Sequence, residues 1–411
     1  MSKVAGATRQ GRDFTLFWGS QAASAVGDRL TGFVAPTVAI LALDASNAEV
    51  GIVAAAGWLA YPAVGLFAGA LLVRARIRRV MVVAELVRFG AFTAVAAAIA
   101  AGWVTSVVPL IVAVAVAGVA TVFTDLSSQV QLPALVPADR LVGANARLQS
   151  TDSASKLVGP ALGGAAVSAL GAVSSLVLGA APFLLSALGR ARLRAPEPAV
   201  PPGNEPVLAR VRDGLRFTSR HPVLGPVVLS SAVRAFGTGA IDAVLLLFAY
   251  RALGMSGTTT GLLLASGAAG ALVGVLCVGP LVRALGARGA LLATAAEGLT
   301  WCAIPLCLAV SAPVPVLFAI RVLSALWIPT WAVVTTSVRQ RVTPADRQGT
   351  VHGTARVLTS STIPLGSFAG GLAAGVGAGL VGQSAALVCV VVVGALCAAC
   401  SVLLLPSEVD P

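Results

Sequence analysis

The sequence PADRLVGANARLQSTDSASKLVGPALGG, at residues 137–164, decides the fold because a second version of it occurs in the same chain. That version, PADRQGTVHGTARVLTSSTIPLGSFAGG, occupies residues 344–371, and each copy lies between two long apolar stretches. Chains made of two similar halves, each threaded through a bilayer, are typical of many secondary transporters. The repeat therefore predicts a duplicated membrane unit.

The composition supports a membrane protein. Hydrophobic residues make up 57% of the 411-residue chain, charged residues make up 11%, and the mean hydropathy is +0.92. Soluble domains carry about 25% charged residues. A soluble fold could not hide this much apolar surface and still place enough charge on the outside. We therefore expect lipid to be the solvent for most of the chain.

Twelve apolar stretches are each long enough to cross a bilayer core of about 30 Å as a helix. They are too long for membrane β-strands and lack period-2 alternation. We expect an all-α membrane protein with twelve transmembrane helices in two six-helix bundles related by pseudo-twofold symmetry. The expected spans are 15–43, 48–73, 80–102, 105–135, 142–170, 172–189, 223–253, 257–282, 289–310, 313–338, 350–376 and 381–405.

The halves are expected to form an N-terminal bundle at residues 1–189 and a C-terminal bundle at residues 223–411. The segment between them, 190–222, is expected to be a cytoplasmic linker. Its prolines favour an extended chain, and the apolar residues and arginines that follow have the spacing of a short amphipathic surface helix. Two further pairs of segments match at an offset of 210 residues: 46–51 with 256–261, and 69–79 with 279–289.

Basic residues gather in alternate loops. If the N-terminus is cytoplasmic, 20 of the 28 Lys and Arg residues fall in cytoplasmic segments, as the positive-inside rule requires. This distribution explains the net charge of +12 without nucleic acid as a partner. The polar N-terminus has no apolar core and does not resemble a signal peptide. We expect a multi-pass protein of the inner or plasma membrane, monomeric, with both termini in the cytoplasm.

All six cysteines lie in predicted spans of the second half. Cys397 and Cys400 have the spacing of a redox motif, but their apolar neighbours favour a packing role. The cysteines form neither a zinc pattern nor a disulfide framework. We expect no cofactor and no metal.

Charged residues inside the spans are candidates for function, because a charge at the bilayer centre costs at least ~2.5–3.5 kcal/mol. Asp28 has no opposite charge three or four residues away in its own helix. A lone carboxylate in a wet cavity can exchange a proton as its surroundings change, which proton coupling requires. The candidates for proton coupling are Asp28, Asp152, Asp125 and Asp242.

Other residues are candidates for a substrate cavity. Lys156 has i, i+4 spacing from Asp152, so the two either form a neutral pair that lets the helix insert or present a lysine to an anionic substrate group. Trp327 and Trp331 lie one turn apart beside Pro329, where they either wall a cavity or simply pack. The cavity candidates are Arg29, Arg147, Lys156, Arg234, Trp327, Trp331 and Arg356.

Several motifs, in this order along the chain, resemble the major facilitator superfamily and its drug-exporter branch, which holds macrolide-efflux and enterobactin-exporter proteins. The first is Gly27-Asp28, and the second is the Ala-Asn-Ala sequence at 144–146. The third is Gly-Pro-x-x-Gly-Gly, which is similar to the antiporter motif of the superfamily. Its residues, which also allow close helix packing, are Gly159, Pro160, Gly163 and Gly164.

One loop departs from the superfamily pattern. The loop after the second span usually reads Gly-x-x-x-Asp-Arg-x-x-Arg-Arg, whereas residues 69–79 read GALLVRARIRR, with Val73 in place of the aspartate. The resemblance implies that this carboxylate helps to hold an inner gate shut, so Glu85 could compensate for its loss. Glu85 and Arg88 also have the spacing of a structural clasp. The inner-gate candidates are Arg74, Arg78, Arg79, Glu85 and Arg88.

The resemblance implies export of a hydrophobic or amphipathic small molecule, such as a drug, antibiotic or siderophore-like compound, driven by inward proton flow through alternating access. A proton-coupled or facilitative importer of a small metabolite is the alternative, because a fold does not fix direction or coupling. We do not expect an enzyme, because His221 and His352 are the only histidines and neither has a convincing catalytic partner in the sequence. The chain also contains no Walker A sequence for ATP.

Overall fold

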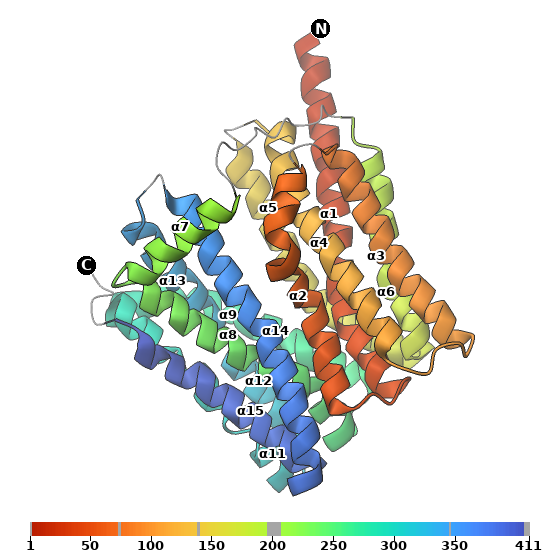
Figure 1. Cartoon of the computed structure of the whole chain (residues 1–411), viewed down its shortest axis with the longest axis vertical. Coiled ribbons are helices and arrows are strands. Elements are labelled where there is room, and N and C mark those ends of the chain that lie inside the picture. The colour runs from red at the N-terminus through yellow and green to blue at the C-terminus, as the bar shows by residue number, and fades with distance from the viewer. Residues whose placement is uncertain (1, 73–74, 138–139, 195–206, 345–346, 407–411) are drawn as a thin grey trace. The chain divides into compact units, whose positions relative to one another are not determined.

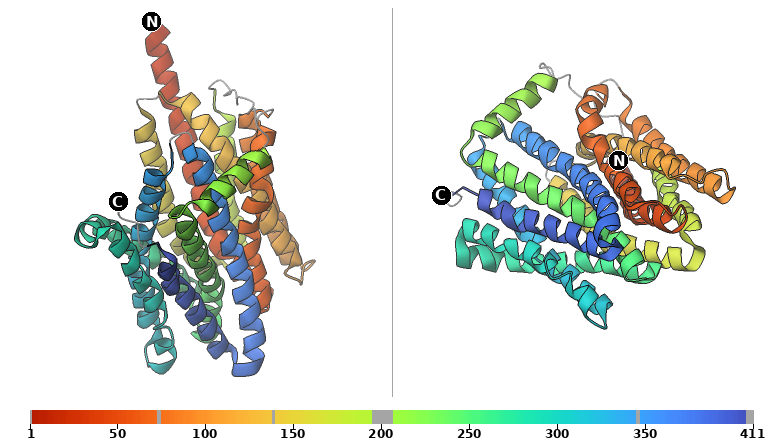
Figure 2. Two further views of the ribbon diagram at one scale, coloured as in Figure 1. Left: turned by 60° about the vertical axis from the view of Figure 1, so that its left-hand side comes forward. Right: turned by 60° about the horizontal axis from the view of Figure 1, so that its bottom comes forward.

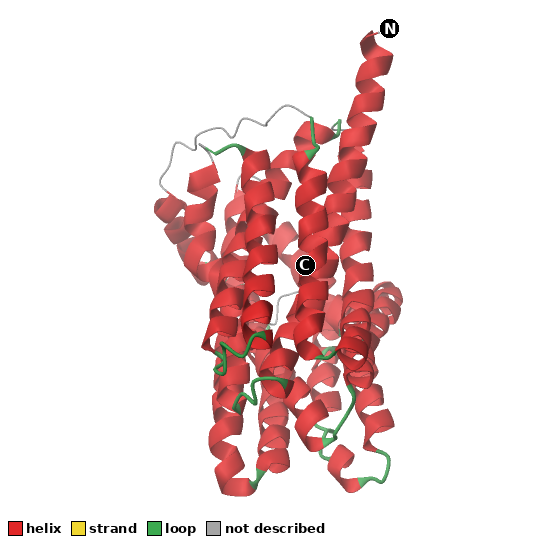
Figure 3. Cartoon of the chain, turned by 90° about the vertical axis from the view of Figure 1, so that its right-hand side faces the viewer, coloured by secondary structure: helices red, strands yellow, loops and turns green. Residues whose placement is uncertain are grey.

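The computed structural model describes residues 2–72, 75–137, 140–194, 207–344 and 347–406. In these ranges every regular element is a helix, as Figure 3 shows. The helices pack as two compact units. The first unit comprises Met1–Leu43 and Leu59–Asn204, and the second comprises Asp44–Trp58 and Glu205–Pro411. The all-helical membrane fold expected from the composition is confirmed.

The first half of the chain contains six long helices, one for each expected span (Figure 1). They are α1 (Ser2–Leu41), α2 (Asn47–Leu72), α3 (Ile77–Ala100), α4 (Val108–Leu135), α5 (Leu141–Leu170) and α6 (Ala172–Ala191). The first turns of α2, up to Trp58, pack with the second unit.

The second half is more segmented. The expected amphipathic helix is present as α7 (Val207–Arg220) and packs against α8 and α14. The other elements are α8 (Leu224–Leu247), η2 (Phe248–Ala252), α9 (Gly257–Ala293), α10 (Ala295–Trp301), α11 (Leu306–Ala309), α12 (Pro313–Ala325), α13 (Ile328–Val342), α14 (Gln348–Val381), α15 (Gln383–Cys400) and η4 (Ser401–Leu404).

Two expected spans are not continuous helices. The stretch 289–310 is divided between the end of α9, α10 and α11, with turns before Pro305. The stretch 313–338 is interrupted between α12 and α13, just before Pro329. Proline has no N–H to donate and clashes with the preceding turn, which explains both interruptions. α9 runs past residue 282 through a kink at Gly286, whose φ of +70° suits glycine.

Within the described ranges, nine helices are long and apolar enough to cross a membrane. The charged helices α1 and α5 and the short segment Ala295–Ala309 are not among them. The expectation of twelve spans is therefore approximate at these three places. Charged residues lower the hydropathy of α1 and α5, and these are the helices that carry several of the candidate site residues.

Close helix packing organises each unit. In the first, α1 packs against α5 and α6, and α3 packs against α4 and α6. In the second, α8 packs against α14 and α15, which Figure 2 shows as neighbouring green and blue helices. A Cβ added at Gly237 would overlap the backbone of Gly394, so these two glycines let α8 and α15 approach.

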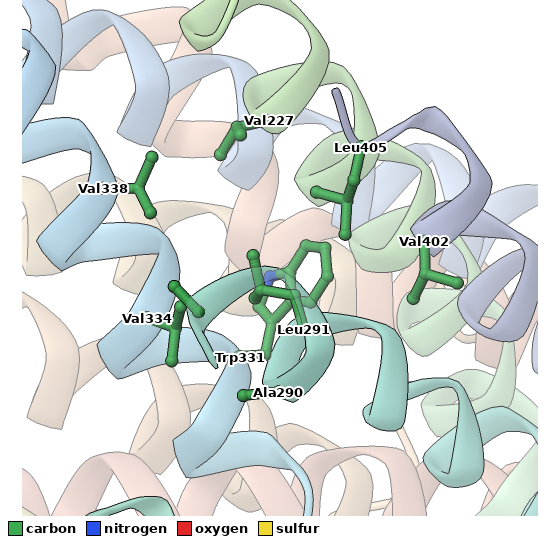
Figure 4. Packing of buried hydrophobic residues seen from close by; sticks show 9 residues of the cluster. Val227, Ala290, Leu291, Trp331, Val334, Val338, Val402 and Leu405 are labelled. Atoms are coloured by element: carbon green, nitrogen blue, oxygen red, sulfur yellow. The ribbon is translucent and has the colours of Figure 1, made fainter. Parts of the chain in front are cut away.

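The second unit contains a buried apolar cluster (Figure 4). Trp331 lies among valine and leucine side chains from α8, α9, α13 and η4. Its members are Val227, Ala287, Ala290, Leu291, Trp331, Val334, Val338, Val402 and Leu405. This packing holds α13 in place, although the helix begins directly after an interruption of the helical structure.

Candidate functional site

A buried ion-pair network joins α1, α3 and α6 in the first unit. Glu85 lies between two arginines, 3.3 Å from Arg88 and 3.2 Å from Arg190, and none of the three side chains is more than 1% exposed. The i, i+3 clasp between Glu85 and Arg88 predicted from the sequence is therefore present. The second arginine comes from α6, so the carboxylate also ties two helices together.

Asp28 of α1 extends this network. Its carboxylate forms an ion pair with Arg88, whose guanidinium also donates to Ser24 at 3.0 Å and stacks on the ring of Phe183 at 3.8 Å. The interpretation of Asp28 as a lone carboxylate is wrong, because its partner comes from another helix. The Asp28 side chain is 37% exposed, so one end of an otherwise buried network is open to its surroundings.

Polar side chains complete the hydrogen bonds of Arg190. It donates to Ser186 at 3.0 Å and to Gln21 at 2.8 Å, and Ser186 donates to Glu85 at 3.1 Å. The cytoplasmic linker expected from the sequence begins at Arg190, yet this residue is completely buried. Ser186 and Arg190 have i, i+4 spacing, and this spacing in the sequence could have indicated that Arg190 shares a face of α6 with Ser186.

Asp152 is the centre of a second, more exposed cluster. Its two oxygens bind different cations: Oδ1 lies 2.9 Å from Arg29 of α1, and Oδ2 lies 2.7 Å from Lys156 of α5. The predicted i, i+4 pair is therefore present, with Arg29 as a third member. The three side chains are between 34% and 46% exposed. One carboxylate faces two cations, so the cluster carries one excess positive charge.

The glycines of the Gly-Pro-x-x-Gly-Gly motif place this cluster. All four motif residues, Gly159, Pro160, Gly163 and Gly164, are buried. A Cβ at Gly159 would overlap the Cβ of Arg29, and one at Gly163 would lie 2.9 Å from the ring of Phe33. Because these glycines have no side chains, α5 packs closely against α1 beside Arg29.

Two other candidates of the first unit form no ion pair with these clusters. Asp125 of α4 is hydrogen-bonded to the hydroxyl of Tyr61, and it lies close enough to Arg88 and Arg190 to interact with them electrostatically. Arg147 is exposed and lines a hollow of about 410 Å³ between α1 and α5, next to Trp18, whose indole donates to Thr151 at 2.9 Å.

The inner-gate arginines are placed differently from one another. Arg78 donates to the backbone oxygen of Leu193 at 2.6 Å and so holds α3 to the end of α6. Arg79 is exposed and lines an apolar groove between α3 and α4. Arg74, together with Val73, lies outside the described residues.

The second unit has a buried ion pair of its own. Arg234 of α8 pairs with Glu297 of α10, and its guanidinium lies 4.7 Å from the ring centroid of Trp331. Trp331 is only 8% exposed and belongs to the apolar cluster, so the structure favours the packing role. Trp327 is partly buried at the start of α13. Asp242 and Arg356 are both exposed, on α8 and α14.

Sequence reasoning missed a polar cluster formed by the first turn of α2. Asn47 and Gln383 exchange two amide hydrogen bonds, of 3.2 and 2.9 Å, and Arg251 donates to Asn47 at 2.8 Å. Gly51 and Gly371 face each other one turn further along, where a Cβ on either would lie within 2.8 Å of the other's Cα. The repeated Ser-x-x-x-x-Gly segments at 46–51 and 256–261 marked this region without revealing its partners.

None of the described His, Cys, Asp and Glu residues gather in a group of three that could hold a metal ion. All six cysteines are free.

Comparison with known proteins identifies the family. The model of the transmembrane secretion effector family matches residues 7–408. A bacterial homologue of the iron transporter ferroportin in an inward-facing state is similar in structure, with a TM-score of 0.70, 20% identity and coverage of 95% of this chain and 98% of that one. The nucleoside transporter NupG has a TM-score of 0.70 at 12% identity and covers 96% of this chain and 98% of that one.

A bacterial homologue of the human lysosomal transporter Spinster, inward-facing and unoccupied, gives a TM-score of 0.69 at 15% identity and covers 96% of this chain and 94% of that one. No curated protein matches the sequence. At these identities the solved structures show a shared fold, and the family match covers almost the whole chain. The chain belongs to the transmembrane secretion effector family and is a multi-pass secondary transporter of the major facilitator type.

Proposed function

We propose that this transporter exports a hydrophobic or amphipathic small molecule in exchange for protons. The family description, a secretion effector, supports outward transport. The observation that carries the coupling is the contact between Asp28, which is 37% exposed, and Arg88, which is buried. This pair links a partly exposed carboxylate to the interior of the helix bundle.

The charge balance explains how a proton would act. Asp28 and Glu85 are the acids paired with Arg88 and Arg190, and Asp125 adds a further carboxylate within electrostatic reach of both arginines. A proton on Asp28 removes the ion-pair partner that α1 gives to Arg88, among buried helices where an unpaired charge is costly. Arg88 must then share Glu85 more closely with Arg190 or turn elsewhere. Protonation thereby biases how α1 packs on α3, which is what coupling requires.

The Asp152 cluster supports an amphipathic substrate with an anionic group. Its excess positive charge lies on two partly exposed side chains, Arg29 and Lys156. An incoming carboxylate or phosphate could pair with either cation without leaving a charge unpaired. The packing of α5 against α1 at Gly159 holds the two cations at a fixed separation.

Localisation and assembly belong to the same proposal. We place the protein as a monomer in a bacterial inner membrane, with both termini in the cytoplasm. The charges of α7 support this orientation, since Arg212, Arg216 and Arg220 are all exposed and suit an anionic cytoplasmic leaflet. A fluorescent protein fused at the C-terminus should therefore fold and fluoresce, whereas an alkaline phosphatase fusion should be inactive.

Transport by the variant Asp28→Asn tests the function. Inside-out vesicles containing the protein are prepared with an acid interior and are given the anionic amphipathic dye 8-anilinonaphthalene-1-sulfonate, and dye uptake and proton release are recorded together. We expect uptake by the unchanged protein and none above background by Asp28→Asn, with equal amounts of both in the membrane. Asp213→Asn, an exposed change on α7, is the matched control.

Other results would contradict the proposal. Proton-driven uptake by Asp28→Asn equal to that of the unchanged protein would remove Asp28 from the coupling. Dye movement that follows only its own gradient, with or without a pH step, would favour a facilitator. Accumulation in right-side-out vesicles would favour an importer.

A further inference from the structure

The outer faces of α3 and α4 form a groove of about 570 Å³ that neither ion-pair network uses. It belongs entirely to the first unit. Its walls come from one face of each helix, between positions 79 and 87 on α3 and between 115 and 123 on α4. Valine and alanine side chains and Phe123 form its walls, and Arg79 lies at one end.

The groove faces away from the core of the unit. Val83 is 57% exposed and Val116 is 40% exposed, whereas Glu85, on the opposite face of α3, is buried in the ion-pair network. In a membrane-spanning unit such an outward apolar face contacts acyl chains. Eight residues of helix rise about 12 Å, which fits within the half-thickness of about 15 Å of a bilayer core.

Charge is found at one end of the groove only. Arg79 is the single charged residue of the lining, and it is exposed. Its neighbour Arg78 is held by the backbone oxygen of Leu193 and is not available to the groove. Within the ranges that the structure describes, no carboxylate pairs with Arg79.

We propose that this groove binds one acyl chain of an anionic phospholipid, whose phosphate pairs with Arg79. The pattern of one cation at the loop end and an apolar wall beyond it complements an amphiphile with a single anionic head at the membrane surface. A guanidinium also suits phosphate geometry, because it can donate two parallel hydrogen bonds.

A second copy of the chain fits this face less well. A symmetric dimer would apply the same patch to itself, so the only charged side chains brought together would be two Arg79 residues. The transported molecule also fits less well, because the wall offers no polar group beyond Arg79 to distinguish it from lipid.

The lipid would act on the network through α3. Arg79 precedes Glu85 by less than two turns of the same helix, so a phosphate held at Arg79 fixes the end of α3 that carries the clasp. The anionic lipid would therefore stabilise the first unit in detergent, and this provides a second readout besides binding.

Native mass spectrometry of the purified full-length protein tests the proposal, with phosphatidylglycerol and phosphatidylcholine as the probes. Arg79→Gln should bind phosphatidylglycerol about fivefold more weakly, the effect of one basic residue at an anionic surface, and leave phosphatidylcholine unchanged. Val116→Trp, which fills the groove, should weaken both lipids. Phosphatidylglycerol should raise the melting temperature of the unchanged protein more than that of Arg79→Gln.

Two controls match these variants. Arg283→Gln removes an exposed arginine of α9, and Leu185→Trp adds the same bulk to an exposed position of α6 outside the groove. Both should bind phosphatidylglycerol as the unchanged protein does. Equal binding by all five proteins would overturn the proposal. A dimer that disappears in Val116→Trp would also overturn it, as would competition between 8-anilinonaphthalene-1-sulfonate and phosphatidylglycerol for the groove.

Discussion

Arg190, near the end of α6, lies 3.2 Å from Glu85 of α3, and both side chains are completely buried. Glu85 also pairs with Arg88, so one carboxylate neutralises part of the charge of two guanidinium groups. Such a group of charges is stable only while every member keeps its partners, because water does not solvate an unpaired charge buried in a helix bundle.

Glu85→Leu should therefore destabilise the protein strongly. Loss of one partner of a buried ion pair costs about 3–5 kcal/mol, and here two arginines lose a partner. Thermal unfolding in detergent should show a large fall in melting temperature. The double variant Glu85→Leu, Arg190→Leu should recover part of it, since it removes a charge of each sign. A double variant no more stable than the single one would contradict the pairing.

The Asp152 cluster should respond differently, because its members are partly exposed. Lys156→Met leaves the pair between Asp152 and Arg29 intact, so its cost in stability should not exceed about 1 kcal/mol. Under the proposed function, the same variant should raise the KM for an anionic amphiphile and leave the KM for a neutral one unchanged. Equal changes for both substrates would argue against an anion-binding role. Arg147→Met, on the same helix but outside the cluster, is the control.

Close contact between α1 and α5 leads to a prediction about glycine. Gly159→Ala should destabilise the protein, because the new Cβ overlaps that of Arg29 and overpacking costs about 1–3 kcal/mol. Gly143→Ala, on the same helix, meets nothing within 4 Å and should be neutral or stabilising, since alanine favours helices. Melting temperatures of the two variants measure the difference. Equal values would show that α1 and α5 do not meet at Gly159.

Apolar length and internal repetition were sufficient to predict most helices, because a membrane helix needs only enough hydrophobic residues to cross the bilayer. They failed at Pro305 and Pro329, where the composition stays apolar while the backbone cannot continue a regular helix. The two interruptions divide apolar stretches that are continuous in composition, because proline cannot donate the backbone hydrogen bond that a regular helix needs.

Ion pairs were predictable only within one helix. The pairs Glu85 with Arg88 and Asp152 with Lys156 follow from spacing, since i, i+3 and i, i+4 residues share a face. The partners of Asp28 and Asp152 on other helices, Arg88 and Arg29, depend on which helices pack together. A single sequence does not show which helices pack together. For this reason Asp28 was interpreted as a lone carboxylate, although Arg88 is its partner.

The polar cluster of Asn47 and Gln383 provides the last prediction. The two side-chain amides donate to each other, and Arg251 adds a charged donor to the oxygen of Asn47. These bonds hold the first turn of α2 to the start of α15 within the second unit, and the contact of Gly51 with Gly371 continues the attachment along α14. The cluster should therefore control how often the first turns of α2 open.

A double-mutant cycle of Asn47→Ala and Gln383→Ala measures this control. Each single variant should expose residues 47–58 to faster hydrogen exchange, because both amides lose a partner. The coupling energy should be about 0.5–1.5 kcal/mol, the range of a net hydrogen bond. Ser256→Ala, which removes the cap of α9 instead, should leave the exchange of residues 47–58 unchanged. Additive effects of the two changes would mean that the amides do not bind each other, and the attachment of α2 would then depend on the glycine contact and Arg251 alone.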